Sequence, residues 1–142
     1  MFKPTLHSLA GLLLASTGAL AAPVSPTDPG LQWGPCPAPM PEGCRIAVLH
    51  GDPAKPNADI FFQVPADAKI PRHAHTSAER IVAVSGELHV RYDGQEPVVL
   101  RPGTYAYGPP KAVHEAHCAK GAPCTLFIAF EEPVDVLAAP AP

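Results

Sequence analysis

The chain has 142 residues and a formal net charge of −3 at pH 7, and its basic and acidic side chains are scattered. A chain of this length has room for one domain, because domains usually span about 100 to 150 residues. The small and evenly spread charge gives no basic patch, which argues against nucleic acid or a membrane surface as a partner.

The first residues have the features of a cleavable export signal. Met1 to Lys3 supply a short positive start, Leu9 to Leu20 form an apolar stretch, and small residues follow at Ala19 and Ala21. The apolar stretch is interrupted by polar residues and is too short for a membrane span of about 20 residues. We therefore expect a signal peptide at 1–21, cleavage after Ala21, and a mature protein that is periplasmic or secreted.

Four cysteines lie in the mature part as two close pairs, Cys36 with Cys44 and Cys118 with Cys124. An even number of cysteines in an exported protein indicates disulfides, and four cysteines allow three different connectivities. We favour the two local pairings because each closes a short loop, although a longer pairing such as Cys36 with Cys118 stays open. Neither pair has the C-x-x-C spacing of a zinc knuckle, which argues against a cysteine metal site.

The segment 22–43 is dense in proline, which cannot donate a backbone hydrogen bond and disfavours regular structure in its neighbours. We interpret it as an extended N-terminal arm that the first disulfide ties down. Trp33 is the one large apolar group in the arm, and we expect it to anchor the arm on the domain.

The region from Cys44 onward consists of short runs rich in Val, Ile, Phe and Tyr, separated by Gly, Pro and Asp. This pattern is typical of β-strands, and Asp93-Gly94 between two apolar runs predicts a hairpin. The predicted strands are 45–50, 60–64, 70–75, 80–84, 87–92, 97–100, 104–107, 114–118 and 125–130. The domain at 44–135 is therefore predicted to be all-β, a sandwich or a small barrel, and 136–142 an Ala/Pro tail.

The most informative segment contains His73, His75 and Glu79. Because successive side chains of a strand alternate between its faces, His73 and His75 project from the same face, close enough to share one ion. Glu79 has the same parity and follows a short turn, and His114 is a fourth possible donor after another turn. Imidazoles with one carboxylate suit a divalent Mn, Fe, Ni, Cu or Zn ion, and the sequence does not choose among these metals.

These residues resemble the two motifs of the cupin superfamily. An HxH pair followed by Glu and Gly matches the first motif, and a spaced Gly, Pro and His matches the second; the matching residues are His73, His75, Glu79, Gly86, Gly103, Pro109 and His114. The resemblance implies a double-stranded β-helix, or jelly-roll barrel, of about six to eight strands. It also implies that His73, His75, Glu79 and His114 hold one metal ion inside the barrel.

The sequence departs from the cupin pattern at three positions. Asp67 and Lys111 stand where the two motifs usually have Gly, and Cys118 replaces the usual Asn. The first two departures bear on loop geometry more than on metal binding. If Cys118 pairs with Cys124, the disulfide would take over the ordering role of the Asn.

The resemblance further implies a metal-dependent enzyme that acts on a small organic substrate. The chemistry would be that of a dioxygenase-like oxidoreductase, or of a lyase or isomerase, and Glu79 could also serve as a base. Tyr105, Tyr107 and Lys111 are candidates for the substrate pocket, since a phenol can donate to an oxygen anion and a lysine can attract an anionic substrate. For the two tyrosines, core packing is the alternative that we favour over a pocket role.

Other functions stay open because the cupin fold hosts many activities. The main alternative is a non-catalytic protein that binds or senses a metal or a small ligand, and a sugar-binding barrel is a further one. An exchangeable coordination position with turnover would indicate an enzyme, whereas a saturated site would indicate binding alone. Cupin relatives often pair through sheet edges, so a homodimer is expected.

Overall fold

The fold is taken from a computed structural model, which describes residues 22–140. These residues contain eleven β-strands and no helix: β1 (Trp33–Pro35), β2 (Arg45–His50), β3 (Asp59–Val64), β4 (Lys69–Ala74), β5 (Glu79–Ser85), β6 (Leu88–Tyr92), β7 (Val98–Leu100), β8 (Tyr105–Gly108), β9 (His114–Cys118), β10 (Cys124–Phe130) and β11 (Leu137–Ala138). The nine predicted strands agree with β2 to β10 to within one residue at each end. The predicted export signal and its cleavage site lie outside the described residues.

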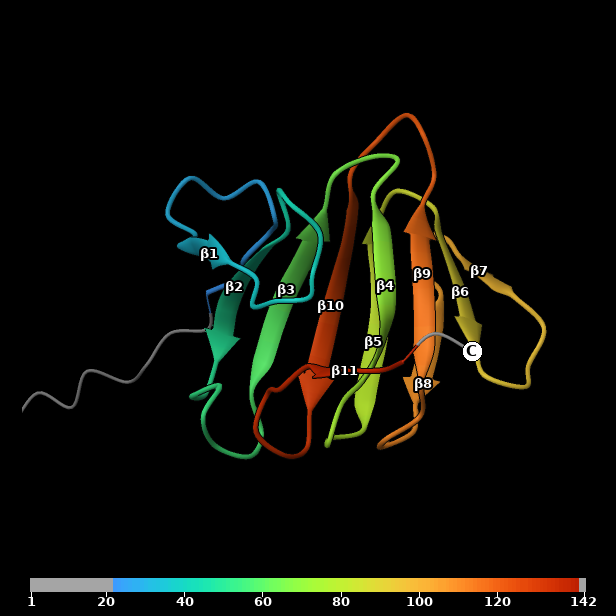
Figure 1. The fold of residues 1–142 in the computed structure, drawn as a ribbon. Coiled ribbons are helices and arrows are strands. Elements are labelled where there is room, and N and C mark those ends of the chain that lie inside the picture. Colours follow the sequence, from blue (N-terminus) through green and yellow to red (C-terminus); the bar gives the residue numbers. More distant parts are fainter. Residues whose placement is uncertain (1–21, 141–142) are drawn as a thin grey trace, which may run out of the picture.

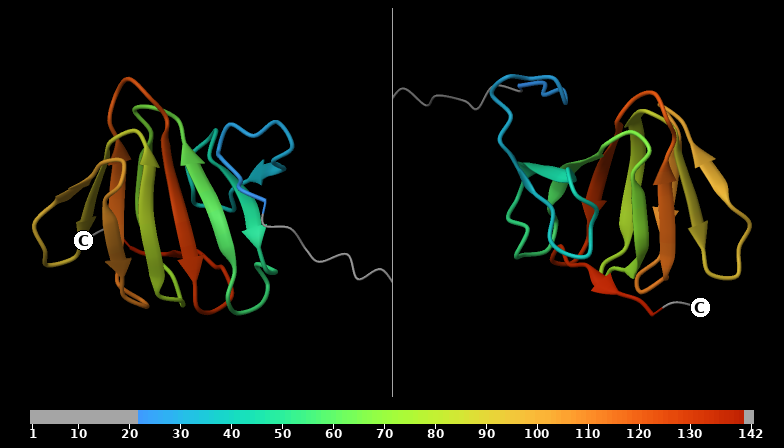
Figure 2. Two further views of the ribbon diagram at one scale, coloured as in Figure 1. Left: turned by 180° about the vertical axis from the view of Figure 1, so that it is seen from behind. Right: turned by 45° about the horizontal axis from the view of Figure 1, so that its top comes forward.

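The strands form two antiparallel sheets, which Figures 1 and 2 show packed face to face as a flattened barrel. One sheet has the order β1-β2-β3-β10-β5-β8, and the other has the order β11-β4-β9-β6-β7. This double-sheet arrangement confirms the predicted jelly-roll architecture. In the described part of the chain, no helix is long and apolar enough to cross a membrane.

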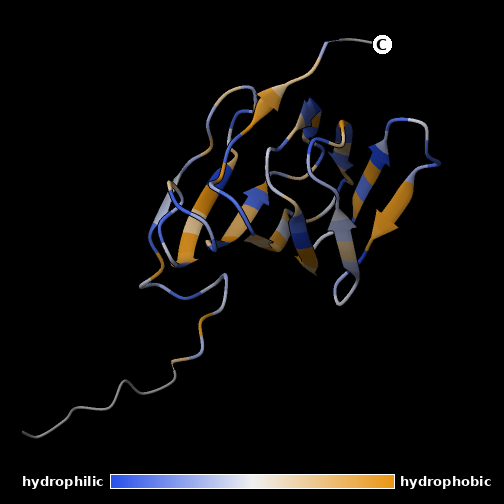
Figure 3. Ribbon diagram, turned by 90° about the horizontal axis from the view of Figure 1, so that it is seen from below, coloured by the Kyte–Doolittle hydropathy of each residue, from blue (hydrophilic) through white to orange (hydrophobic). Residues whose placement is uncertain are grey.

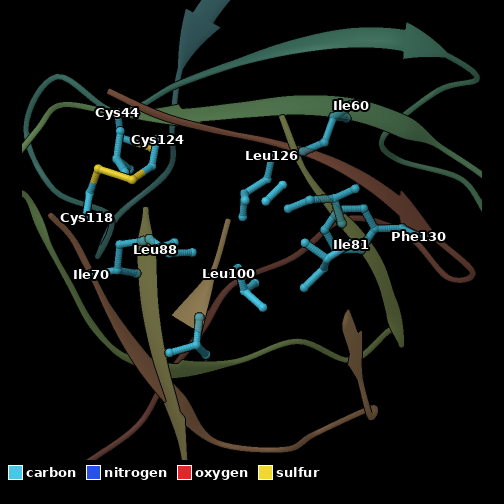
Figure 4. Packing of buried hydrophobic residues seen from close by; sticks show 14 residues of the cluster. Cys44, Ile60, Ile70, Ile81, Leu88, Leu100, Cys118, Cys124, Leu126 and Phe130 are labelled. Atoms are coloured by element: carbon cyan, nitrogen blue, oxygen red, sulfur yellow. A yellow bond between two sulfur atoms is a disulfide. The ribbon is translucent and has the colours of Figure 1, made fainter. Parts of the chain in front are cut away.

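The interior of the barrel is apolar because one side chain in two along each strand points inward. Figure 3 shows the resulting alternation of apolar and polar residues along several strands, and Figure 4 shows the buried side chains pointing toward one another. Ile81 of β5, Leu88 of β6 and Ile128 of β10 are each almost completely buried. Burying such side chains provides the main stabilisation of the barrel.

Both local disulfides are present, as predicted. Cys36–Cys44 ties the N-terminal arm to the residue before β2, with a Cα–Cα distance of 5.5 Å. Cys118–Cys124, with a Cα–Cα distance of 5.8 Å, joins the end of β9 to the start of β10. Because β9 and β10 belong to different sheets, this second disulfide clamps the two layers together at one end of the barrel (Figure 4).

The two terminal segments are more regular than the sequence indicated. In the arm, β1 pairs with β2, and the guanidinium carbon of Arg45 lies 4.4 Å from the centre of the Trp33 ring. In the segment expected to be a tail, β11 pairs with the end of β4, so that Leu137 lies opposite Ala74. The chain after β10 therefore crosses one end of the barrel, as Figure 1 shows.

A β-bulge in β4 sets the direction of its last side chains. Ile70 pairs with Ala116 and His73 pairs with His114, so β4 has one more residue than β9 between these two pairs. Strict alternation would point His73 away from the side of Ile70, yet both side chains are buried. The extra residue restores the inward direction of His73, and Pro71, which has no N–H to contribute to the ladder, lies within the bulge.

Candidate metal centre

Three histidines and one glutamate converge inside the barrel, near the end that the C-terminal segment crosses. His73 comes from the end of β4, His75 follows directly after that strand, His114 comes from the start of β9 and Glu79 from the start of β5. The three imidazoles each offer a ring nitrogen within 4.8 Å of the others, and all four side chains are buried. Nε2 of His75 lies 3.4 Å from Oε1 of Glu79, and Nε2 of His114 lies 3.9 Å from Oε2.

The second nitrogen of each ring is held by the backbone. Nδ1 of His73 lies 2.7 Å from the carbonyl oxygen of Pro71, Nδ1 of His75 2.6 Å from that of Asp135, and Nδ1 of His114 3.0 Å from that of Ala112. A carbonyl oxygen only accepts hydrogen bonds, so each Nδ1 carries the proton and donates. Each Nε2 is therefore left with a free lone pair, the arrangement that orients histidine ligands toward a metal.

Burial favours the neutral form of the imidazoles. It lowers the pKa of His73 to about 3, and the nearby charge of protonated His114 lowers it further. Burial also lowers the pKa of His114. Burial raises the pKa of Glu79, against the opposing effect of His75. Near neutral pH the two histidines are thus unprotonated at Nε2 and able to bind a cation.

The loop between His75 and Glu79 is fixed by the chain that follows β10. The hydroxyl of Ser77 accepts hydrogen bonds from the backbone N–H groups of Glu131 and Glu132, at 2.8 and 3.0 Å. The carboxylate of Asp135 accepts from the backbone N–H and the hydroxyl of Thr76, at 2.8 and 2.5 Å. Together with the bond from His75 to the Asp135 carbonyl, these contacts make the C-terminal segment part of the site.

The four side chains face a cavity with a volume of about 90 Å³. Its walls are mainly aliphatic and aromatic side chains from both sheets, among them Phe62, Ile81, Val90, Leu126 and Ile128. Met40 from the arm and Val134 from the C-terminal segment complete it. Among the described residues, no lysine or arginine lines this space.

The three residues predicted for the substrate pocket lie elsewhere. Tyr105 and Tyr107 are 60% and 51% exposed, and Lys111 is also exposed. On β8 the inward position falls to Ala106, which lines the cavity, so the tyrosines on either side of it point outward. The tyrosine that lines the cavity is Tyr92, whose ring lies 4.8 Å from that of His114. Alternation along β6 predicts this direction from the sequence, because Tyr92 lies two residues after Val90, whose side chain points inward.

The two positions where the cupin motifs usually have Gly adopt a left-handed backbone. Asp67 has φ 65° and Lys111 has φ 62°, a region that glycine enters freely and most other residues enter at a cost. Asp is among the residues that tolerate this conformation, whereas Lys is not. The backbone N–H of Lys111 donates to the carbonyl oxygen of His75 at 2.7 Å, so the strained turn also supports the site.

Comparisons with known proteins identify relatives of this barrel. Residues 30–133 match the ChrR cupin-like domain family. The comparison with curated proteins found no match to this sequence.

Three solved structures illustrate the similarity of fold. The polyketide cyclase RemF from Streptomyces resistomycificus has a TM-score of 0.70 and 18% identity, over 87% of this chain and 88% of that one. A cupin 2 conserved barrel protein from Rhodopseudomonas palustris has a TM-score of 0.67 and 16% identity, with the same coverages. The DMSP lyase DddQ from Ruegeria pomeroyi has a TM-score of 0.65 and 19% identity over 77% of this chain, which spans 61% of the length of the lyase. At these identities the likeness establishes the fold alone.

Proposed function

Because the chain belongs to the ChrR cupin-like family, we propose that it is an exported protein whose barrel holds one divalent metal ion through His73, His75, Glu79 and His114. We further propose that it is a metal-dependent enzyme acting on a small organic molecule. Two disulfides are typical of proteins outside the reducing cytoplasm and support the export part of the proposal.

The observation that carries the metal assignment is the orientation of the three imidazoles. Each Nδ1 donates to a backbone carbonyl, so three Nε2 lone pairs meet inside an apolar cavity. Three converging lone pairs at one point of the cavity wall cannot satisfy one another, and a cation is the partner that satisfies all of them. Glu79 adds a carboxylate within 4 Å of two of these nitrogens and offsets part of the ion's charge.

Several features support an enzyme over simple metal storage. A divalent ion in this site would supply Lewis-acid or redox chemistry. Four protein ligands leave one or two coordination positions, and the apolar walls exclude water from the space beside them. Glu79, whose pKa is raised by burial, could hold a proton within this space. The similar structures named as a lyase and a cyclase are enzymes for small organic molecules.

Elemental analysis of natively exported protein tests the metal assignment. Wild-type protein is expected to carry about one divalent ion per chain, and His75→Ala much less. The control His89→Ala alters a half-buried histidine that does not line the cavity, and it should carry as much metal as wild type. Equal metal in all three proteins would overturn the assignment.

Water proton relaxation separates an enzyme from a storage protein. Mn²⁺-loaded protein with an open coordination position is expected to relax bulk water strongly, because a bound water exchanges with solvent. Mn²⁺-loaded protein that leaves water relaxation unchanged would have a saturated site and would favour the non-catalytic alternative.

A further inference from the structure

Tyr92 brings the one phenol of the cavity to the metal centre. It is the last residue of β6 and lies opposite His114 on β9, with the two rings tilted by 33° and 4.8 Å apart. Leu88 and Val90, which share its side of the strand, are buried in the interior. The side chain of Tyr92 therefore points into the barrel beside one of the proposed ligands.

The hydroxyl of Tyr92 reaches across the barrel to the opposite sheet. A Cβ atom placed on Gly108 would lie 2.8 Å from this hydroxyl and 3.0 Å from Oε2 of Glu79. Gly108 belongs to β8 and pairs with Glu79 on β5. The phenol hydroxyl and the Glu79 carboxylate therefore both lie close to this glycine. The absence of a side chain at Gly108 leaves room for both groups.

The hydroxyl is a hydrogen-bond donor without a protein acceptor. In the part of the chain that the structure describes, this hydroxyl takes part in no hydrogen bond, and every fully buried polar side-chain atom has a partner, so the hydroxyl is open to the cavity that Tyr92 lines. A phenol keeps its proton at physiological pH, because its ordinary pKa is about 10. A retained proton directed into a cavity can be donated to a ligand.

The remaining cavity wall limits what this ligand can be. Apart from the four proposed metal ligands, Tyr92 and Asp135, the lining is apolar, and Asp135 already uses its carboxylate and carbonyl oxygens within the protein. The volume of about 90 Å³ is below the roughly 150 Å³ of an apolar cavity that admits benzene, which has six non-hydrogen atoms, so the cavity accommodates about four non-hydrogen atoms.

We infer that Tyr92 is a specificity-determining residue that donates a hydrogen bond to an oxygen atom of a small ligand with a hydrocarbon body. This inference rests on the proposed function, because the metal centre forms the other polar wall of the same cavity. The ligand is a carbonyl compound or a carboxylate, whose oxygen lies at the metal end while its body contacts the apolar side chains. A hydrocarbon of the same size would leave the Tyr92 hydroxyl unpaired.

Three probes of four non-hydrogen atoms test the inference: acetone, acetate and isobutane. Their binding to full-length wild-type protein, Tyr92→Phe and the control Tyr105→Phe is followed by NMR titration, and metal content and thermal midpoint are measured on each sample. Tyr105→Phe removes an exposed phenol outside the cavity. Gly108→Ala is a second variant, which keeps the phenol but occupies the space that its hydroxyl needs.

Tyr92→Phe is expected to weaken the better oxygen-bearing probe about 3- to 10-fold, the effect of one hydrogen bond, and to leave isobutane binding unchanged. Gly108→Ala should weaken the same probe, and Tyr105→Phe should not. Preference for acetone identifies the ligand as neutral, and preference for acetate identifies it as anionic.

Two results would overturn the inference: equal binding of the oxygen-bearing probes by wild type and Tyr92→Phe, or no binding of either probe by wild type. Metal content reports separately on the proposed function. A wild type that lacks metal contradicts the metal centre, whereas normal metal in a Tyr92→Phe protein with unchanged probe binding contradicts only the role of Tyr92.

Discussion

Ser77 links the loop of the metal centre to the chain after β10, and its hydroxyl should matter for stability. Its side chain is 1% exposed and accepts two backbone hydrogen bonds, from Glu131 at 2.8 Å and Glu132 at 3.0 Å. Ser77→Ala removes this acceptor with little change in volume. At about 1 kcal/mol net for each bond, the free energy of unfolding should fall by about 2 kcal/mol. For a domain of this size the midpoint of thermal unfolding should fall by about 6 to 10 °C.

Urea and thermal unfolding of Ser77→Ala, followed by circular dichroism with a chelator present, measure this loss without a contribution from bound metal. Ser85→Ala is the matched control, because the Ser85 hydroxyl makes only an exposed hydrogen bond of 3.2 Å to Pro123. The control should lose less than about 0.5 kcal/mol. If Ser77→Ala is no less stable than Ser85→Ala, the two backbone bonds do not hold the C-terminal segment as argued.

Three further predictions concern the site and its supports. Asp135→Ala should lower metal affinity about 10-fold in a chelator competition assay, because Asp135 holds the backbone at His75, and Glu132→Ala should not. Lys111→Gly should raise the free energy of urea unfolding by about 0.5 to 1 kcal/mol by relieving its positive φ, and Lys111→Ala should give no such gain. Hydrogen bonding to Arg72 lowers the pKa of Asp93 in the folded protein. The stability that this pair contributes is therefore present above the unfolded pKa of 3.8 and is lost as pH falls through the lower folded pKa. Asp93→Asn should flatten that part of a plot of unfolding free energy against pH.

Much of the barrel could be predicted from local sequence patterns. The strands β2 to β10 follow from apolar alternation and turn residues, and the two disulfides follow from the short spacing of the cysteines. The convergence of His73, His75 and His114 follows from the cupin motifs, which place donors at strand ends that meet in this fold. These features depend on the nearest neighbours of each residue, or on a pattern already known from other proteins.

The features that the sequence did not reveal depend on partners distant in the chain. The bulge in β4 is defined only by its pairing with β9, so alternation alone could not show that Ile70 and His73 both point inward. The outward direction of Tyr105 and Tyr107 depends on which face of β8 is buried, and the small Ala106 takes the inward position. A short strand with several aromatic residues gives no local signal of which face is buried.

The pattern of backbone acceptors explains why the supposed tail belongs to the metal centre. The acceptors of the His73 and His114 rings lie two residues before each histidine, so the local turn suffices to orient these rings. The acceptor of His75 is the carbonyl of Asp135, 60 residues away, and no side-chain substitution can delete that oxygen. The orientation of His75 is thus set by how the C-terminal segment docks, through Ser77, Thr76 and the β11–β4 pairing. Loosening this segment should therefore weaken metal binding while all the metal ligands remain in place.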